Sequence, residues 1–327
     1  MRRREFITLV GALGGTVALP FATRALESER QLRRIGVLWP GTTPPMPPRM
    51  ESFRQGLGDA GMIEGRDFLI EVRYARDGLQ QLPELVSELV RMKVDVIQPA
   101  GDNAIRIAQQ ATTTIPIVAN SDDMLGMGLI SSLSRPGGNI TGLTILSPEL
   151  NAKRLQLLKD LIPAVLRVAA LWDPTTGKSQ VTQTETAARS LQIKLQILEI
   201  RSAKDLVAAF EEARREQAEA LNVFSSPFLA SIYREIIDLA ANHRLPAIYQ
   251  WKEHAEAGGL ISYGPSLAGM WRQTGQIVAK VLRGANPAEY PVEQPIKFEL
   301  VINLKTAKAL GRAIAPSLLN NADEVIE

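Results

Sequence analysis

The residues best suited to bind a small molecule lie directly after predicted β-strands. In the first half of the chain these residues are Trp39, Gly101, Asp102, Asn103, Asn120 and Asp122. A tryptophan can wall an apolar or aromatic ligand, a glycine lets the backbone approach it closely, and carboxylates and amides orient its polar groups. Ordinary structural roles also fit, because Trp39 could be core packing, Asp102 or Asn103 could cap a helix, and the polar run after Ala119 could be a simple turn.

The second half of the chain offers a matching set after its own predicted strands. Its members are Asp173, Ser225, Ser226, Tyr249 and Tyr263. We expect Asp173 to pair with a ligand ammonium group, the two serines to donate hydrogen bonds to a carboxylate, and the two tyrosines to flank an aromatic slot. The serines could instead cap a helix that begins at Pro227, and the tyrosines could be packing residues.

Residues for catalysis or metal binding are scarce. The two histidines, His243 and His254, lack metal-ligand spacing, and the chain has no cysteine. No nucleophile elbow, phosphate loop or paired-carboxylate motif occurs, and the glycines at 11, 14 and 15 that mimic a dinucleotide fingerprint lie in the N-terminal leader described below. We therefore expect no enzyme activity, no metal and no cofactor. The polar Glu253-His254 pair is expected on a solvated surface.

Apolar runs and helical repeats alternate along the chain. We expect strands at 35–39, 68–74, 94–98, 115–119, 167–172, 194–200, 220–224, 247–250, 259–263 and 298–303, with helices between them that include long ones at 227–243 and 267–282. Strands that alternate with helices indicate parallel sheets flanked by helices. Two such runs predict two doubly wound α/β lobes, with the Gly- and Pro-rich segment 134–148 as the first crossover between them.

The N-terminal lobe is predicted to comprise residues 33–146 and 266–285, and the C-terminal lobe residues 147–265 and 290–327. Ligands of open parallel sheets bind beyond the carboxyl ends of the strands. The strand-end residues therefore predict a ligand cleft between the two lobes. We expect the polar head of the ligand between the Gly101 and Asp122 side and the Asp173 and Ser225 side, and its flat body near Trp39 and Tyr263.

The first 25 residues differ from the rest of the chain. Arg2-Arg3-Arg4 precedes an apolar run at 6–19, and Ala22-Thr23-Arg24-Ala25 offers small residues for cleavage. This order is typical of a signal peptide at residues 1–25, and the apolar run is too short to span a bilayer. The paired arginines resemble the twin-arginine export signal, with a general secretory signal or a buried N-terminal helix as alternatives. Since no cysteine follows the leader, we expect a periplasmic protein without a lipid anchor.

Composition is ordinary for a soluble globular protein, and 327 residues suffice for two domains. The formal net charge is +2, but four of the arginines lie within the leader. The chain after the leader is therefore close to neutral. Nothing in this charge pattern indicates a nucleic-acid partner.

Several runs resemble one bacterial family in the same order along the chain. They are Leu57–Arg66, Val94–Ile97, Thr114–Val118, Arg135–Gly142, Gly259–Gly264, Pro291–Pro295 and Val301–Ala307. In these runs the chain is similar to the ABC-transporter substrate-binding proteins related to tryptophan and tyrosine binders. The resemblance covers nearly all of the chain after the leader, and Arg-Pro-Gly-Gly-Asn-Ile-Thr-Gly at 135–142 is its most specific motif.

The resemblance implies a type I periplasmic-binding-protein fold, in which three crossovers join two lobes that close on a ligand. It also implies a monomer that captures a small molecule, such as an amino acid or aromatic compound, and delivers it to ABC permease subunits in the inner membrane. Two acidic stretches depart from the family pattern. Ser121-Asp122-Asp123 stands where relatives often have Gly-Asp-Pro, and Asp173-Pro174 stands where many have Asn-Pro. These extra carboxylates suit an ammonium-bearing ligand.

Two other kinds of binding protein share this fold. A sensory protein would report its ligand to a membrane receptor without transport, and the sequence does not separate this function from import. A repressor effector domain would need a DNA-binding headpiece before Ile35, where the chain carries an export leader instead. Solute capture for an ABC import system is therefore the predicted function, with sensing as the alternative.

Overall fold

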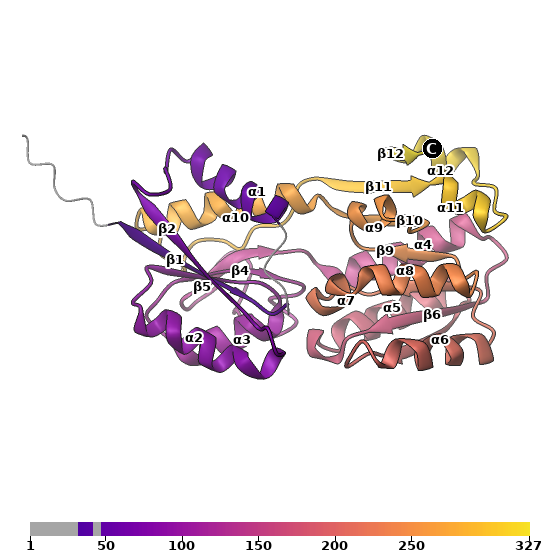
Figure 1. Cartoon of the computed structure of the whole chain (residues 1–327), viewed down its shortest axis with the longest axis horizontal. Coiled ribbons are helices and arrows are strands. Elements are labelled where there is room, and N and C mark those ends of the chain that lie inside the picture. The colour runs from indigo at the N-terminus through magenta and orange to yellow at the C-terminus, as the bar shows by residue number, and fades with distance from the viewer. Residues whose placement is uncertain (1–31, 42–46) are drawn as a thin grey trace, which may run out of the picture. The chain divides into compact units, whose positions relative to one another are not determined.

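The computed structural model describes residues 32–41 and 47–327. The signal peptide predicted at residues 1–25 lies outside these residues. Within the described part of the chain, every helix is too short or too polar to span a bilayer. The chain forms two α/β lobes, each built around its own sheet (Figure 1).

The N-terminal lobe contains a five-stranded parallel sheet in the order β2-β1-β3-β4-β5. Its strands are β1 (Arg33–Trp39), β2 (Phe68–Tyr74), β3 (Val96–Pro99), β4 (Ile117–Ser121) and β5 (Ile140–Thr144). Side chains of β1 alternate between the two faces, so Val37 packs with α1 (Pro47–Asp59) and α10 (Leu267–Leu282), whereas Leu38 packs with α2 (Leu82–Arg91) and α3 (Asp102–Ala111). A short 3₁₀ helix, η1 (Leu79–Gln81), precedes α2.

The fifth strand lies inside the segment that was predicted to be the first crossover. Glycine and proline give residues 134–148 the composition of a loop, yet Ile140–Thr144 pairs with β4 in parallel. Gly142 has a φ of +134°, and a Cβ atom there would lie 2.2 Å from the carbonyl oxygen of Ala119. This close approach requires glycine, which is why a buried strand has a loop-like sequence.

The C-terminal lobe contains a seven-stranded sheet in the order β12-β11-β10-β9-β8-β6-β7. Its strands are β6 (Arg167–Trp172), β7 (Lys194–Glu199), β8 (Ala220–Val223), β9 (Ala247–Tyr249), β10 (Ile261–Pro265), β11 (Phe298–Asn303) and β12 (Glu324–Ile326). Its helices are α4 (Ser147–Leu161), η2 (Pro174–Thr176), α5 (Ser179–Ser190), α6 (Asp205–Arg215), α7 (Pro227–Ser231), α8 (Tyr233–Asn242), α9 (Lys252–Glu256), α11 (Leu304–Ala309) and α12 (Pro316–Asn320). The β11 strand pairs antiparallel with β10, so this sheet is mixed.

Two local predictions in the C-terminal lobe were wrong. The single helix predicted from 227 to 243 is interrupted at Ile232, whose backbone (φ −110°, ψ 19°) leaves the helical region between α7 and α8. Glu253 and His254 lie in α9 rather than on a solvated surface, and His254 is only 5% exposed. Its ring stacks on Tyr233 at a centroid distance of 4.8 Å, and burial lowers the pKa of His254 to about 3.

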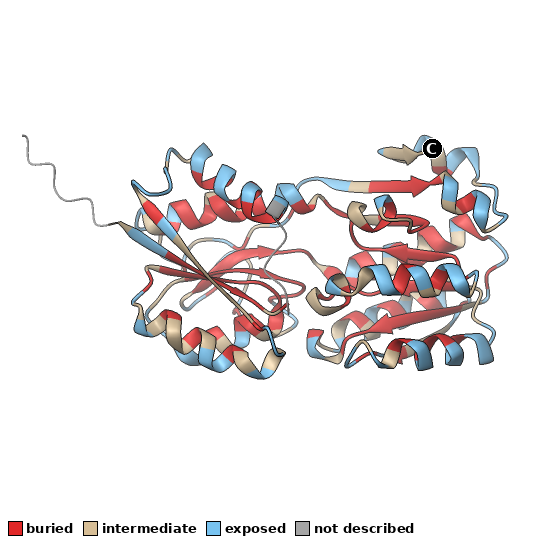
Figure 2. Ribbon diagram, in the orientation of Figure 1, coloured by how far each residue is buried: buried red, intermediate tan, exposed pale blue. Residues whose placement is uncertain are grey.

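The long helix α10 follows a strand of the C-terminal sheet but packs in the N-terminal lobe, against α1 (Figure 1). Glycines allow the two helices to approach closely. A Cβ atom at Gly56 would lie 1.9 Å from the carbonyl oxygen of Arg272, and one at Gly275 would lie 2.2 Å from that of Phe53. The central strands of both sheets and the inner faces of their helices are buried (Figure 2).

Alanine at Gly275 should destabilise the protein, because its methyl group would have to displace backbone of the facing helix. We expect Gly275→Ala to lower the free energy of unfolding by about 1–3 kcal/mol in chemical denaturation. Gly58→Ala is the control, because Gly58 lies in the same helix as Gly56 and nothing lies near its Cβ position. This variant should change the free energy of unfolding by less than about 1 kcal/mol or stabilise the protein. Equal stability of the two variants would contradict this packing.

Candidate ligand-binding cleft

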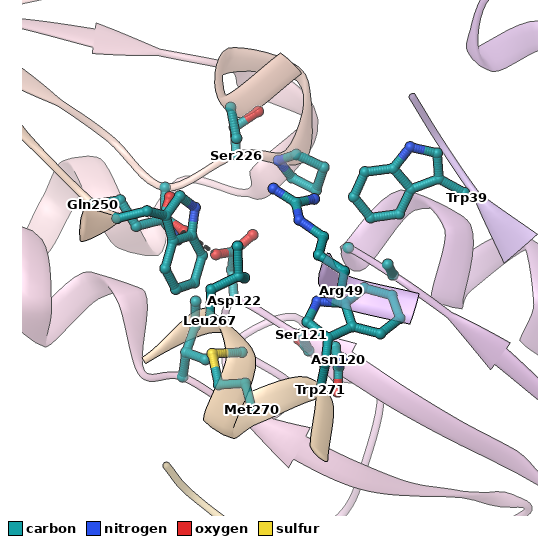
Figure 3. A pocket seen from close by; sticks show the side chains of 17 residues that line it. Trp39, Arg49, Asn120, Ser121, Asp122, Ser226, Gln250, Leu267, Met270 and Trp271 are labelled. Carbon is teal, nitrogen blue, oxygen red and sulfur yellow. Dashed lines mark hydrogen bonds between the residues drawn. The ribbon is translucent and has the colours of Figure 1, made fainter. Parts of the chain in front are cut away.

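A cavity lies between the two lobes and is lined by residues from both. The N-terminal sheet, α1 and α10 supply one side, and the loops after β8 and β9 supply the other. Its lining comprises Trp39, Arg49, Ala100, Gly101, Asn120, Ser121, Asp122, Ile145, Ser225, Ser226, Pro227, Ala230, Gln250, Trp251, Leu267, Met270 and Trp271 (Figure 3).

Parallel strands bring most of the polar lining together. Trp39 ends β1 and Ser121 ends β4, while Ser225 and Gln250 follow β8 and β9. Because parallel strands end at the same edge of a sheet, residues far apart in sequence converge on one side of the cleft. The two lobes point these edges at each other, which makes a site that neither lobe forms alone.

Aromatic rings form the apolar walls of the cavity. The Trp39 and Trp271 rings lie 6.1 Å apart between centroids, and Phe53 packs edge-on against Trp271 at 6.2 Å. Trp251 approaches from the C-terminal lobe and belongs to the same buried apolar cluster as the other two tryptophans. Such walls suit a flat apolar or aromatic body.

Arg49 brings a buried positive charge into the cavity. It is 8% exposed, and its guanidinium carbon lies 5.0 Å from the centre of the Trp39 ring. Its Nε has no hydrogen-bond partner, and no carboxylate of the described residues forms an ion pair with it. Burial lowers the pKa of Arg49 to about 10, so it remains a cation at neutral pH. An unpaired buried cation is costly unless a ligand compensates it.

Asp122 links the two lobes through hydroxyl groups. Its Oδ1 accepts hydrogen bonds from Ser147 Oγ at the start of α4, at 2.7 Å, and from Ser225 Oγ of the C-terminal lobe. Gln250 Nε2 in turn donates to Ser225 Oγ at 2.6 Å. A second buried carboxyl group, Asp102, accepts from Ser121 Oγ and from the backbone N–H of Asp122.

Burial raises the pKa of both carboxyl groups. For Asp102 it does so to about 8, and the charge of Asp122 adds to the effect. The pKa of Asp122 is also raised by burial, against the lowering effect of the hydrogen bonds from Ser225 and Ser147. Two such groups in one water-poor region favour a state in which one carries a proton.

This proton makes stability depend on pH in a definite direction. The folded protein binds a proton at Asp102 between about pH 4 and pH 8 that the unfolded chain releases, so the wild type should lose stability as the pH rises through this range. Asp102→Asn removes the contribution of Asp102 to this pH dependence and leaves that of Asp122. Between pH 4 and pH 8, the free energy of unfolding of the wild type, measured with denaturant, should fall by at least about 1 kcal/mol relative to that of this variant. Parallel pH profiles would contradict the assignment.

The predicted site residues fall into three groups. Those that line the cavity are Trp39, Gly101, Asn120, Asp122, Ser225 and Ser226. Asp102, Asn103 and Asp173 line a second, smaller cavity, which shares only Gly101 and Pro227 with the first. Tyr249 and Tyr263 line neither of these two cavities.

The residues outside the main cavity have structural contacts. Asp173 accepts hydrogen bonds from the backbone and hydroxyl of Thr175 and from Ser226 Oγ, and it caps η2. Tyr249 is 1% exposed and packs edge-on against His254, whereas Tyr263 stacks on Phe298. Ser226 combines both expected roles, since it lines the cavity and caps α7.

Sequence reasoning missed Arg49, Trp251 and Trp271. Trp251 follows β9 directly, so the strand-end rule could have found it. Trp271 lies on a helix whose apolar face resembles ordinary core, and Arg49 lies near the start of α1, away from every strand end. Only the tertiary packing of α1 and α10 brings these two residues to the strand-end cleft.

The chain matches the ABC transporter substrate-binding protein family over residues 34–326. It belongs to this family. A tyrosine-binding protein from Clostridioides difficile strain R20291 is 24% identical over 288 residues, which are 87% of this chain and 82% of the relative. The two-lobed architecture and the strand-end cleft agree with the family assignment.

Solved structures with the same fold are at similar or lower identity. An ABC domain from Streptococcus pneumonia in complex with L-Trp has a TM-score of 0.82 at 24% identity, covering 90% of this chain and 100% of its own. The leucine-binding protein LivK from Thermotoga maritima has a TM-score of 0.58 at 13% identity, covering 78% and 84%. This substrate-binding protein therefore has the type I periplasmic-binding-protein fold.

Proposed function

We propose that this protein is the solute-binding component of an ABC import system and captures a small organic ligand in the cleft between its lobes. The observation that carries the proposal is the cavity itself, which draws its lining from both lobes. A site completed only when two lobes meet is suited to the capture and release of a ligand.

An aromatic amino acid is the first candidate ligand. Three of the four tryptophans of the chain, Trp39, Trp251 and Trp271, line the cavity. The relatives named above include a tyrosine-binding protein and a domain in complex with L-Trp. Walls made of tryptophan rings, together with charged groups in the lining, match a ligand that has a flat body and a polar head.

We further propose that the protein acts in the periplasm as a monomer. The leader at residues 1–25 would direct export, with the twin-arginine route favoured by Arg3-Arg4, and would then be removed. The ligand-loaded closed form would dock on ABC permease subunits in the inner membrane. Detection of the protein in a periplasmic extract, and its loss from that extract after both arginines are replaced by lysine, would support this route.

Ligand binding should depend on the tryptophan walls. We expect L-tryptophan, L-tyrosine or L-phenylalanine to raise the melting temperature and to bind in titration calorimetry. Trp271→Leu should raise the Kd of the compound that binds about tenfold, because one ring contact is lost. Trp172→Leu is the matched control, since Trp172 lies in the C-terminal lobe and does not line the cavity. If no aromatic amino acid or aromatic acid binds, capture of such a ligand is excluded.

Closure should depend on Gly101, which lies against Pro227 of the facing lobe. Gly101 has a φ of +81°, and a Cβ atom there would lie 2.5 Å from Cγ of Pro227. Gly101→Ala should hold the lobes apart and weaken ligand binding, with a larger radius of gyration in X-ray scattering of the ligand-saturated protein. Gly128→Ala, at φ +67° with nothing near its Cβ position, controls for backbone strain.

Pro227→Ala provides a second check on the same contact. It removes the ring atoms that meet residue 101, so the double variant should regain part of the affinity lost by Gly101→Ala alone. Additive losses would mean that the two residues do not meet during closure.

Transport and sensing are separated by an uptake experiment. Deletion of the gene should abolish uptake of the radiolabelled ligand if the protein serves an importer. Undiminished uptake together with tight binding would instead favour the sensory function.

A further inference from the structure

A buried guanidinium group and a buried carboxyl group enter the same cavity without pairing. Arg49 projects from α1 and Asp122 follows β4, and both side chains point into the space between the tryptophans (Figure 3). No ion pair joins them or joins either one to another described residue. A ligand with both an anionic and a cationic group would compensate both charges at once.

We propose that the cleft recognises the zwitterionic head of an α-amino acid, with Arg49 binding its carboxylate and Asp122 binding its ammonium group. This inference rests on the proposed function, because it assumes that the cavity is the ligand site. It assigns the head-group chemistry, and hence excludes aromatic acids and aromatic amines as equally good ligands.

Arg49 has the features of a carboxylate-binding residue. Its guanidinium carbon lies 5.0 Å from the centre of the Trp39 ring, while its Nε has no partner among the described residues. Glu253 in α9 is the acidic group with the largest effect on Arg49, yet the two form no ion pair. Burial raises the pKa of Glu253, which favours its neutral form. A planar guanidinium group held in this way can bind a carboxylate with two parallel hydrogen bonds.

Asp122 lies close to other carboxyl groups. The carboxyl groups of Asp102 and Asp173 act on it from the same lobe and from the facing lobe, and Arg154 of α4 is the cation that acts on it. Two serine hydroxyls occupy Oδ1, while the second carboxylate oxygen faces the cavity (Figure 3). An ammonium group next to this oxygen would stabilise the charged carboxylate in a region that otherwise favours protonation.

The same geometry explains how the cleft can reject close analogues. An alkyl amine that carries an aromatic ring would place its ring against the tryptophan walls and pair with Asp122. It would leave Arg49 buried and unpaired. An aromatic acid would satisfy Arg49 and leave Asp122 without its cation. Sites that bind a polar group in a buried setting reject analogues that lack it, because the protein partner then stays desolvated and uncompensated.

The test uses three ligands that share an indole ring and differ in the charged head. L-tryptophan has both charges, tryptamine lacks the carboxylate and 3-indolepropionate lacks the ammonium group. Titration calorimetry at pH 7 should give a Kd for each analogue about 10- to 100-fold higher than for L-tryptophan.

Two variants then assign each charge to its residue. Arg49→Gln should raise the Kd of L-tryptophan about 10- to 100-fold and leave that of tryptamine unchanged, and Arg49→Lys should recover part of the loss. Asp122→Asn should raise the Kd of L-tryptophan by a similar factor and leave the Kd of 3-indolepropionate unchanged. Arg54→Gln on the same helix, and Asp123→Asn next to Asp122, are matched controls that line no part of the cavity and should leave every Kd unchanged.

The outcomes distinguish this inference from the proposed function. If Arg49→Gln lowers the affinity for tryptamine as much as the affinity for L-tryptophan, Arg49 has only a structural role and the inference fails. If either analogue binds as tightly as L-tryptophan, the head-group assignment fails while ligand capture stands. If none of the three indoles, L-tyrosine or L-phenylalanine binds the folded wild type, capture of aromatic amino acids fails, and the inference fails with it. Thermal melting of each variant without ligand identifies any loss of folding.

Discussion

The hydrogen bond from Ser225 to Asp122 joins the two lobes at the base of the cleft. It brings a buried carboxyl group of one sheet edge against a hydroxyl of the other, and Ser147 holds the same oxygen from the start of α4. Because a buried carboxyl group needs such partners, closure of the cleft and satisfaction of Asp122 are the same event. The Gly101–Pro227 contact and the packing of Trp251 with Trp39 and Trp271 also cross from one lobe to the other, so they depend on the same arrangement.

The cleft combines apolar walls with charges that are incompletely compensated. Tryptophan rings provide area but little selectivity for the head of a ligand, since any flat body can stack on them. In the proposed recognition of the head group, Arg49 and Asp122 would supply the selectivity, because desolvation makes an unpaired charge costly. A ligand that neutralises both charges also reduces the cost of bringing the lobes together, which couples recognition to closure.

The fold was largely predictable from the sequence because its signals are local. Alternating apolar runs and helical repeats indicated two α/β lobes, and the helix at 267–282 and the strand at 298–303 were located with their observed ends. The missed elements had misleading local chemistry. The β5 strand has a glycine where β4 approaches closely, and α9 carries a polar Glu253-His254 pair that tertiary packing buries.

By itself, the sequence determined that strand-end loops such as Asn120–Asp122 and Ser225-Ser226 would face a cleft, because parallel strands place their ends at one edge. Tertiary structure alone decided which helices complete that cleft. Residues 49 and 271 are far apart in the chain and follow no strand, and glycines that let α1 and α10 pack closely hold both helices against the N-terminal sheet. Packing between distant segments leaves no local pattern. For that reason the sequence revealed the acidic side of the site but not the arginine and the tryptophan that face it.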